Sequence, residues 1–179
     1  MRAQGVIFRH TVEAFVARVI VRTGLLSLEF DRELRELGVD VHRPRDVDLT
    51  TWSRLVRATA KRLSPQKPED EALEDVGREM LRGFAASLVG KGLMFVLRRL
   101  GPRRALLRMP DNYRSADSVT EVTARELSSQ EIELTFNSTG EMPTYVRGLM
   151  LETLAQLKTP ATATYEVRPE GTVFKISWS

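Results

Sequence analysis

The sequence predicts a single α+β domain over residues 1–179, in which a mainly helical region, 1–110, precedes a sheet with one helix, 111–179. Two observations lead to this prediction. Before residue 110, apolar residues recur every three or four positions, as on the buried face of a helix. After it, they alternate with polar residues in short segments, as in half-buried strands. The resulting order β-β-α-β-β is typical of a four-stranded antiparallel sheet packed on helices.

Five helices are expected in the first region, and most are bounded by residues that start or stop a helix. Gly38 ends the second helix, because glycine adopts the left-handed backbone conformation without strain. Thr50 or Thr51 caps the third helix, in which Trp52 faces inward. Pro68 opens the fourth helix in its first turn, ahead of acidic residues that complement the helix dipole. The helices are expected at residues 11–22, 31–37, 50–63, 68–88 and 93–100, with one further turn at 103–108.

The fourth helix carries two glycines within a regular apolar stripe. Glycine lowers the stability of a helix interior by about 1 kcal/mol relative to alanine. Gly77 and Gly83 therefore indicate either close contact with another helix or a less regular helix. The Gly90–Gly92 segment follows this helix rather than a strand, so it predicts a helix break and not a phosphate-binding loop. The apolar stripe consists of Leu73, Val76, Met80, Leu81, Phe84 and Leu88.

Four strands and one helix are expected in the second region. In the third strand, Tyr165 and Val167 are expected to face inward, and a tight turn leads to the fourth strand. Phe174, Ile176 and Trp178 lie on one face of that last strand by their alternation with polar residues. The strands are expected at residues 119–125, 131–136, 162–168 and 172–178, with a helix at 143–157 between the second and the third.

The composition excludes several kinds of site. The chain has no cysteine, which excludes disulfides, thiolate metal sites and cysteine nucleophiles. Its two histidines, His10 and His42, lack the spacing and partners of a metal site. Ser138 lacks the flanking glycines of a nucleophile elbow. We therefore expect no enzyme activity, no metal and no cofactor. An enzyme would need a cleft that brings His10 or His42 beside a carboxylate and a nucleophile.

No segment predicts a membrane span or a targeting signal. A transmembrane helix needs about 18 or more consecutive apolar residues, and no stretch approaches that length. We expect a cytoplasmic protein, located at the cell poles only through its partners.

Basic residues are concentrated between Leu81 and Pro110, a segment without any acidic residue. Such a stripe is either a solvated helix face or a surface that attracts phosphate, an anionic membrane or an acidic partner. It lacks interleaved aromatic residues and any nucleic-acid-binding motif, so nucleic acid is not the expected partner. Arginine and aromatic residues often anchor protein interfaces. The candidate protein-binding residues are Arg98, Arg99, Arg103, Arg104 and Tyr113.

Several stretches spread over nearly the whole chain share the pattern of one protein family. The most specific are Leu100–Leu106 and the terminal Trp178, and they accompany Gly5–Phe8, Arg35–Asp40, Trp52, Val76–Arg78, Asn112–Tyr113 and Pro143–Gly148. They resemble an uncharacterised, highly paralogous domain family found almost only in myxobacteria. That family has no established catalytic activity, and at least one member is a motility-polarity adaptor. The resemblance implies a non-catalytic signalling adaptor in cell polarity and gliding motility, with a small Ras-like GTPase and a response-regulator-type protein as partners.

The layout of helices followed by β-β-α-β-β is also similar to the heme nitric-oxide-binding domain, best over Glu131–Trp178. That family holds heme through a histidine in the helices before the sheet, but this chain has no histidine after His42. It also holds the heme propionates with a Tyr-x-Ser-x-Arg motif, of which Phe136–Gly140 keeps only Ser138. The resemblance implies the fold without heme, its cavity filled by side chains. The alternative function is a small-molecule sensor that keeps an apolar cavity between helices and sheet.

Overall fold

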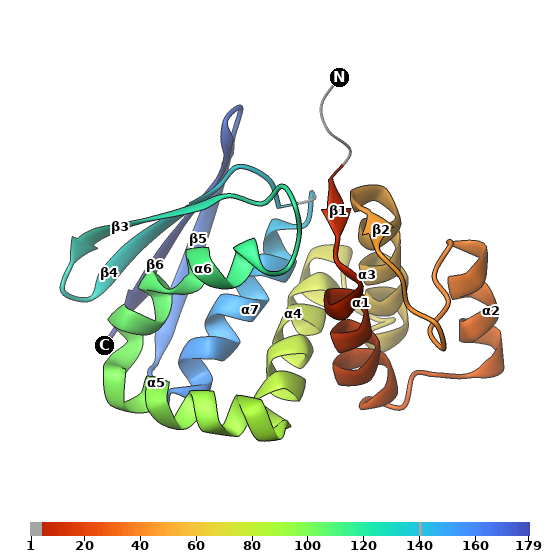
Figure 1. Cartoon of the computed structure of the whole chain (residues 1–179). Helices are drawn as coiled ribbons and strands as arrows, with labels where there is room; N and C mark the ends of the chain where they lie inside the picture. The colour runs from red at the N-terminus through yellow and green to blue at the C-terminus, as the bar shows by residue number, and fades with distance from the viewer. Residues whose placement is uncertain (1–4, 140) are drawn as a thin grey trace.

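The computed structural model describes residues 5–139 and 141–179, so residues 1–4 and Gly140, the end of the Phe136–Gly140 stretch, lie outside the described residues. A sheet lies at one side of the molecule, and the amino-terminal helices lie at the other (Figure 1). The elements are β1 (Val6–Ile7), α1 (Arg9–Phe15), η1 (Val16–Val21, a π-helix), α2 (Leu28–Glu36), β2 (Val47–Asp48), α3 (Leu49–Leu63), α4 (Glu69–Ala86), α5 (Leu88–Leu107), α6 (Met109–Arg114), β3 (Val122–Ser128), β4 (Glu131–Phe136), α7 (Pro143–Gln156), β5 (Ala161–Arg168) and β6 (Gly171–Trp178).

The main sheet confirms the predicted four antiparallel strands, in the order β3-β4-β6-β5. Strand β4 has the predicted bounds, and its residues Ile132, Leu134 and Phe136 are buried in alternation with half-buried neighbours. The prediction that Val167 faces inward was wrong, because this residue is 67% exposed. Val167 pairs with Thr172 next to the turn, and this end of the β5–β6 hairpin extends beyond the helices (Figure 1).

The helix starts differ from the predicted ones because other residues act as caps. The Asp48 carboxylate, not Thr50 or Thr51, caps α3, accepting a hydrogen bond of 2.8 Å from the Thr51 amide. Ser27 caps α2, so that helix begins three residues before the predicted start. Pro68 occupies the N-cap of α4 rather than its first turn. The two-residue strands β1 and β2, which pair with each other, are too short to produce a periodic signal.

A sharp bend at Ser87 separates α4 from α5, which meet at an angle of 96°. The Ser87 hydroxyl donates to the Phe84 carbonyl (2.7 Å) and accepts from the Gly90 amide (3.1 Å), so one residue ends α4 and starts α5. The break thus comes before the Gly90–Gly92 segment. Leu88 then lies outside the buried stripe and is 89% exposed. Within the described ranges, no single helix is long and apolar enough to cross a membrane, although α4 and α5 together meet that test by length and composition.

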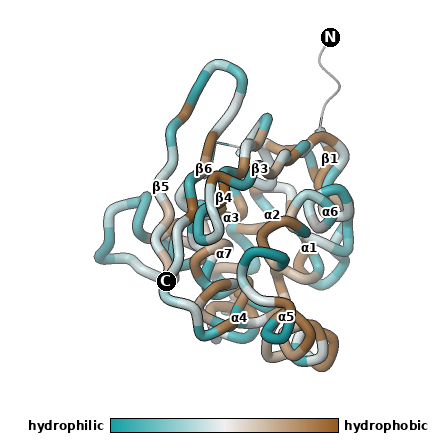
Figure 2. The backbone as a smooth tube through the Cα atoms, turned by 90° about the vertical axis from the view of Figure 1, so that its left-hand side faces the viewer, coloured by the Kyte–Doolittle hydropathy of each residue, from teal (hydrophilic) through white to brown (hydrophobic). Residues whose placement is uncertain are grey.

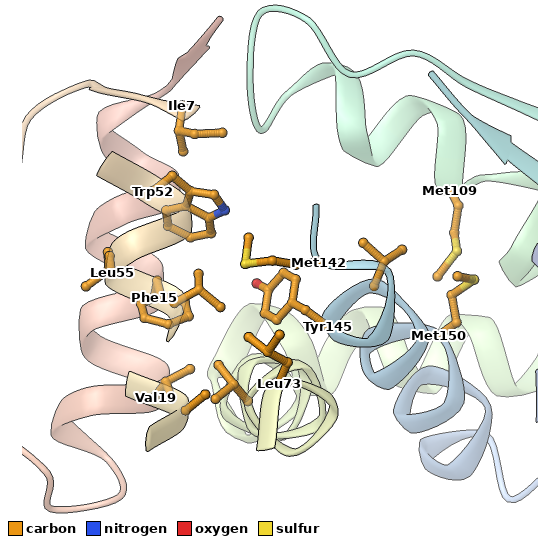
Figure 3. Close-up of a cluster of buried hydrophobic side chains, with 14 of the residues drawn as sticks. Ile7, Phe15, Val19, Trp52, Leu55, Leu73, Met109, Met142, Tyr145 and Met150 are labelled. Atoms are coloured by element: carbon orange, nitrogen blue, oxygen red, sulfur yellow. The ribbon is translucent and has the colours of Figure 1, made fainter. Parts of the chain in front are cut away.

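The core joins the helical region to the sheet region through α4 and α7. Phe15 of α1 and Trp52 of α3 pack edge to face, with ring centroids 5.1 Å apart. Both lie opposite Tyr145 at the start of α7, with Leu73 of α4 below them (Figure 3). All four side chains are buried, so one hydrophobic core is shared by the two regions.

Gly77 of α4 and Gly148 of α7 allow these two helices to touch backbone to backbone. A Cβ at Gly77 would collide with the carbonyl oxygen of Tyr145, and a Cβ at Gly148 would collide with the carbonyl oxygen of Glu74. The two glycines are therefore reciprocal, each accommodating the backbone of the other helix. Gly83, the second glycine of α4, is packed in the same way against the backbone of Arg18. The structure confirms the close helix contact that the glycines of α4 indicated.

We expect Gly77→Ala and Gly148→Ala each to lower the free energy of unfolding by about 3 kcal/mol, because neither helix backbone can move away without opening the core. Urea denaturation of the two variants measures the effect. Gly92→Ala is the control, since a Cβ at this helical position meets nothing within 4 Å. It should leave stability unchanged or raise it by up to about 1 kcal/mol. Equal stability of Gly77→Ala and the unmodified protein would contradict the backbone contact.

Candidate functional site

A cavity of about 500 Å³ lies between the amino-terminal helix, α4, α5, α6 and α7. This volume is in the range of small-molecule sites, roughly 300–1,000 Å³. The exposed residues His10 and Ser115 line the cavity, so it reaches the surface there. Side chains therefore leave this space partly open. The lining comprises His10, Thr11, Ala14, Arg18, Met80, Leu81, Phe84, Leu93, Met94, Leu97, Ala105, Met109, Tyr113, Ser115, Ala116, Leu149 and Thr153.

The walls of the cavity are shaped by two interruptions of the helices, at Ser87 and at Gly101. The bend at Ser87 directs α5 away from α4, and the two helices together form one side. Gly101 has a φ of +81°, a left-handed conformation that interrupts α5 and lets its last turns change direction. Met94 comes before this break, while Ala105 comes after it. Met109 opens α6, a helix not predicted from the sequence, and it lies near Met150 of α7 (Figure 3).

Most polar groups of the lining are already engaged by the protein. The Thr11 hydroxyl donates to the Ala116 carbonyl, and the Thr153 hydroxyl donates to the Leu149 carbonyl, both at 2.8 Å. The His10 Nε2 lies 2.7 Å from the Ser115 carbonyl oxygen, which can only accept, so Nε2 carries the proton. These groups close the backbone around the cavity and leave its interior largely apolar.

Arg18 differs from the polar lining residues just described. It lies in the π-helical segment η1, a type of distortion that occurs frequently at functional sites. Its guanidinium carbon lies 4.8 Å from the centre of the Phe84 ring, and burial lowers the pKa of the group below its ordinary value. Within the described part of the chain, its side chain has no hydrogen bond and no ion pair. No carboxylate belongs to the described lining.

Sequence reasoning missed Arg18. A signal was present: Val16–Ile20 is apolar on the face that packs inward, and Arg18 is the single charge within it. In a regular α-helix over these residues, Arg18 lies beside the apolar face rather than within it. The π-helical winding changes the angle between successive side chains, and it brings Arg18 to the edge of the buried face.

The lining does not fit a heme. Heme iron requires a strong axial ligand such as an imidazole, a thiolate or a phenolate. His10 supplies the imidazole of the described lining, but its Nε2 is engaged by the Ser115 carbonyl and its exposed ring stacks on Phe8 with centroids 5.9 Å apart. Burial strongly raises the pKa of Tyr113, which disfavours the phenolate. In the described ranges, no cluster of three or more metal-ligating side chains is present either.

The four predicted protein-binding arginines are all exposed, and some of them also contact neighbouring elements. Arg98 Nε donates to the Gln156 carbonyl at the end of α7 (2.9 Å), and Arg103 forms an ion pair with Glu126 of β3 (2.6 Å). Arg99 lies over the Phe95 ring at 5.1 Å, and Arg104 is exposed. Two of the four therefore fix α5 to its neighbours. Tyr113 belongs to the core margin, because its ring packs edge to face on Phe136 at 4.9 Å and lines the cavity.

Solved structures with the same fold are H-NOX proteins. An Fe(II) unliganded H-NOX protein from K. algicida is 15% identical, with a TM-score of 0.68 over 97% of each chain. An oxygen-binding H-NOX domain related to soluble guanylate cyclases is 16% identical, with a TM-score of 0.70 over 96% of this chain and 94% of that one. A mutant of T. Tengcongensis H-NOX is 15% identical, with a TM-score of 0.67 over 96% of this chain and 97% of that one. At such low identity these matches establish the fold, which confirms the predicted architecture.

No curated protein matches the sequence. One family profile does, and it covers residues 5–179, almost the entire chain. The chain belongs to the family described as protein of unknown function, DUF2378.

Proposed function

We propose that the protein is a signalling domain that senses a small, mainly apolar molecule in the cavity beside α4. The observation that carries this proposal is the cavity itself, about 500 Å³ in volume and lined mostly by apolar side chains. Burial of each methylene group of a ligand contributes about 0.8 kcal/mol to binding, so an apolar ligand of roughly ten carbons has sufficient driving force.

The position of the cavity supports a sensing role. Its walls include Ala14 of the amino-terminal helix, Phe84 of α4, Leu97 of α5, Met109 of α6 and Leu149 of α7. A ligand in the cavity therefore touches helices of both regions. A molecule that binds two orientations of these helices with different affinity shifts their equilibrium, which is the physical basis of a sensor.

The neutral fluorophore 1-aminoanthracene, used as a general probe of apolar cavities, should bind the protein with a stoichiometry of one. Ala14→Phe places an aromatic ring in the cavity and should abolish this binding, because the ring occupies the space of the probe. The measurement is a fluorescence titration. Ala17→Phe is the matched control, since Ala17 is exposed and lies outside the lining. This variant should bind the probe as the unmodified protein does. Equal binding by both variants would place the probe elsewhere and contradict the proposal.

Hemin should not form a defined complex with the protein, because His10, the imidazole of the described lining, is exposed and held by the Ser115 carbonyl. We expect a broad absorption band of unligated hemin, identical for the unmodified protein and for His10→Ala. The measurement is an absorption spectrum of the ferric and reduced forms. A sharp Soret band that disappears in His10→Ala would identify a heme ligated by His10. That result would contradict the proposed apolar ligand.

A second function, protein binding, is favoured by an unpartnered stripe on α5. Leu88, Val89, Phe95 and Val96 are exposed, and Phe95 alone exposes 60% of its surface. Their spacing places them on one face of the helix, where they follow each other at intervals of about two turns. The hydrophobic colour along α5 is visible in Figure 2. Large apolar side chains gathered on one exposed face are typical of a protein interface, and Arg99 provides a positive charge at its end.

We propose a small Ras-like GTPase as the protein partner, with a response-regulator-type protein as the second; both follow from the family resemblance. Pull-down from native lysate should retain the GTPase more strongly with a non-hydrolysable GTP analogue than with GDP. Phe95→Ser combined with Val96→Ser should abolish retention. Val167→Ser changes an exposed apolar residue of β5 and is the control. This variant should retain the GTPase. Absence of a GTPase from every sample would eliminate this partner.

A further inference from the structure

Arg18 is a charged group that is partly removed from water, and no described residue forms an ion pair or a hydrogen bond with its side chain. Two other arginines of this region, by contrast, form ion pairs. Arg22, one turn further on, forms an ion pair with Glu79 of α4. Arg82 forms ion pairs with both Glu79 and Glu152, the latter at 3.1 Å. These carboxylates are therefore already occupied by other guanidinium groups.

The surroundings of Arg18 hold its side chain against the cavity. Gly83 packs directly on the backbone and Cβ of Arg18, so α1–η1 and α4 are in close contact at this point. The guanidinium lies over the Phe84 ring, and both residues belong to the cavity lining. A charge in such an apolar environment interacts more strongly with an opposite charge than it does in water.

We propose that the cavity takes an amphiphilic anion, whose apolar chain fills the cavity and whose carboxylate or phosphate head group is bound by Arg18. This inference rests on the proposed sensing function and specifies its ligand class. The planar guanidinium fits both head groups through paired hydrogen bonds. Because no carboxylate lies in the described lining, the cavity repels no anion and provides no competing partner for Arg18.

The test compares ligands of equal chain length and different charge. Decanoate and decyl phosphate are the anionic probes, and 1-decanol is the neutral one, each titrated calorimetrically against the intact protein. The two anions should bind about 10- to 100-fold more tightly than decanol, as expected for a hydrogen bond to a charged group. The stronger of the two anions identifies the head group.

The variant Arg18→Met removes the charge but keeps an apolar side chain of similar length. It should weaken binding of the anions by about 10- to 100-fold and leave decanol unchanged. Arg18→Lys should restore part of the difference. Arg99→Met is the matched control, because Arg99 also lies over a phenylalanine ring but is outside the cavity. It should bind all three probes as the unmodified protein does.

Thermal unfolding distinguishes ligand recognition from a structural role of Arg18. Removal of a partly buried charge without an internal partner should raise the unfolding midpoint of the free protein by about 2 °C in Arg18→Met. If Arg18 had a structural role, the unfolding midpoint of Arg18→Met would be lower than that of the unmodified protein. A lower midpoint would therefore contradict this proposal.

The binding outcomes separate the two proposals. Equal affinity for decanoate and decanol, or anion binding that Arg18→Met leaves unchanged, would overturn the anion inference and leave the apolar sensor intact. Failure of all three probes to bind would overturn both proposals.

Discussion

The reciprocal contact of Gly77 and Gly148 is the constraint on which the arrangement of this fold depends. It lets α4 and α7 meet at backbone distance, and α7 is the helix on which the sheet packs. The helices leave this crossing in the same direction, since Arg82 of α4 pairs with Glu152 of α7 further along. Their next turns provide Phe84 and other residues to the cavity wall. A close contact at one point thus defines both the core and the open space beside it.

The charged residues mostly stabilise this arrangement. Glu74 lies at the glycine crossing, where desolvation acts to raise its pKa, but hydrogen bonds from Arg78 and Arg147 hold the pKa below its usual value. Arg103 similarly connects α5 to β3 through Glu126. Part of the basic stripe that the sequence shows is therefore engaged in separate structural contacts. The same reasoning makes Arg18 conspicuous, because its surroundings offer ring contact but no described carboxylate.

Periodicity was sufficient to predict the architecture from the sequence, but local hydrogen bonds decided the details. Strand β4 and the last two strands have strong alternation, and their positions were close to those observed. The predicted break after α4 lies later than the observed bend at Ser87, because a serine can end one helix and begin the next without altering the apolar pattern.

The site was less accessible to sequence reasoning. A cavity is defined by what several helices leave unfilled, and no pattern within one segment contains that information. Arg18 lines the cavity from a π-helical segment, and a projection that assumes a regular α-helix misplaces side chains in such a segment.

The cavity has a cost in stability, and the residues that line it do not reduce that cost. An unfilled apolar space lowers stability, by roughly 20–25 cal/mol for each Å³ when a core side chain is truncated. Small residues such as Ala14, Ala105 and Ala116 line it, although larger side chains at these positions would fill part of the space. Selection for stability alone would favour such filling, whereas selection for binding keeps the space open. The small residues along the wall are consistent with the proposed sensing function, because a larger side chain at any of these positions would occupy space that the ligand needs.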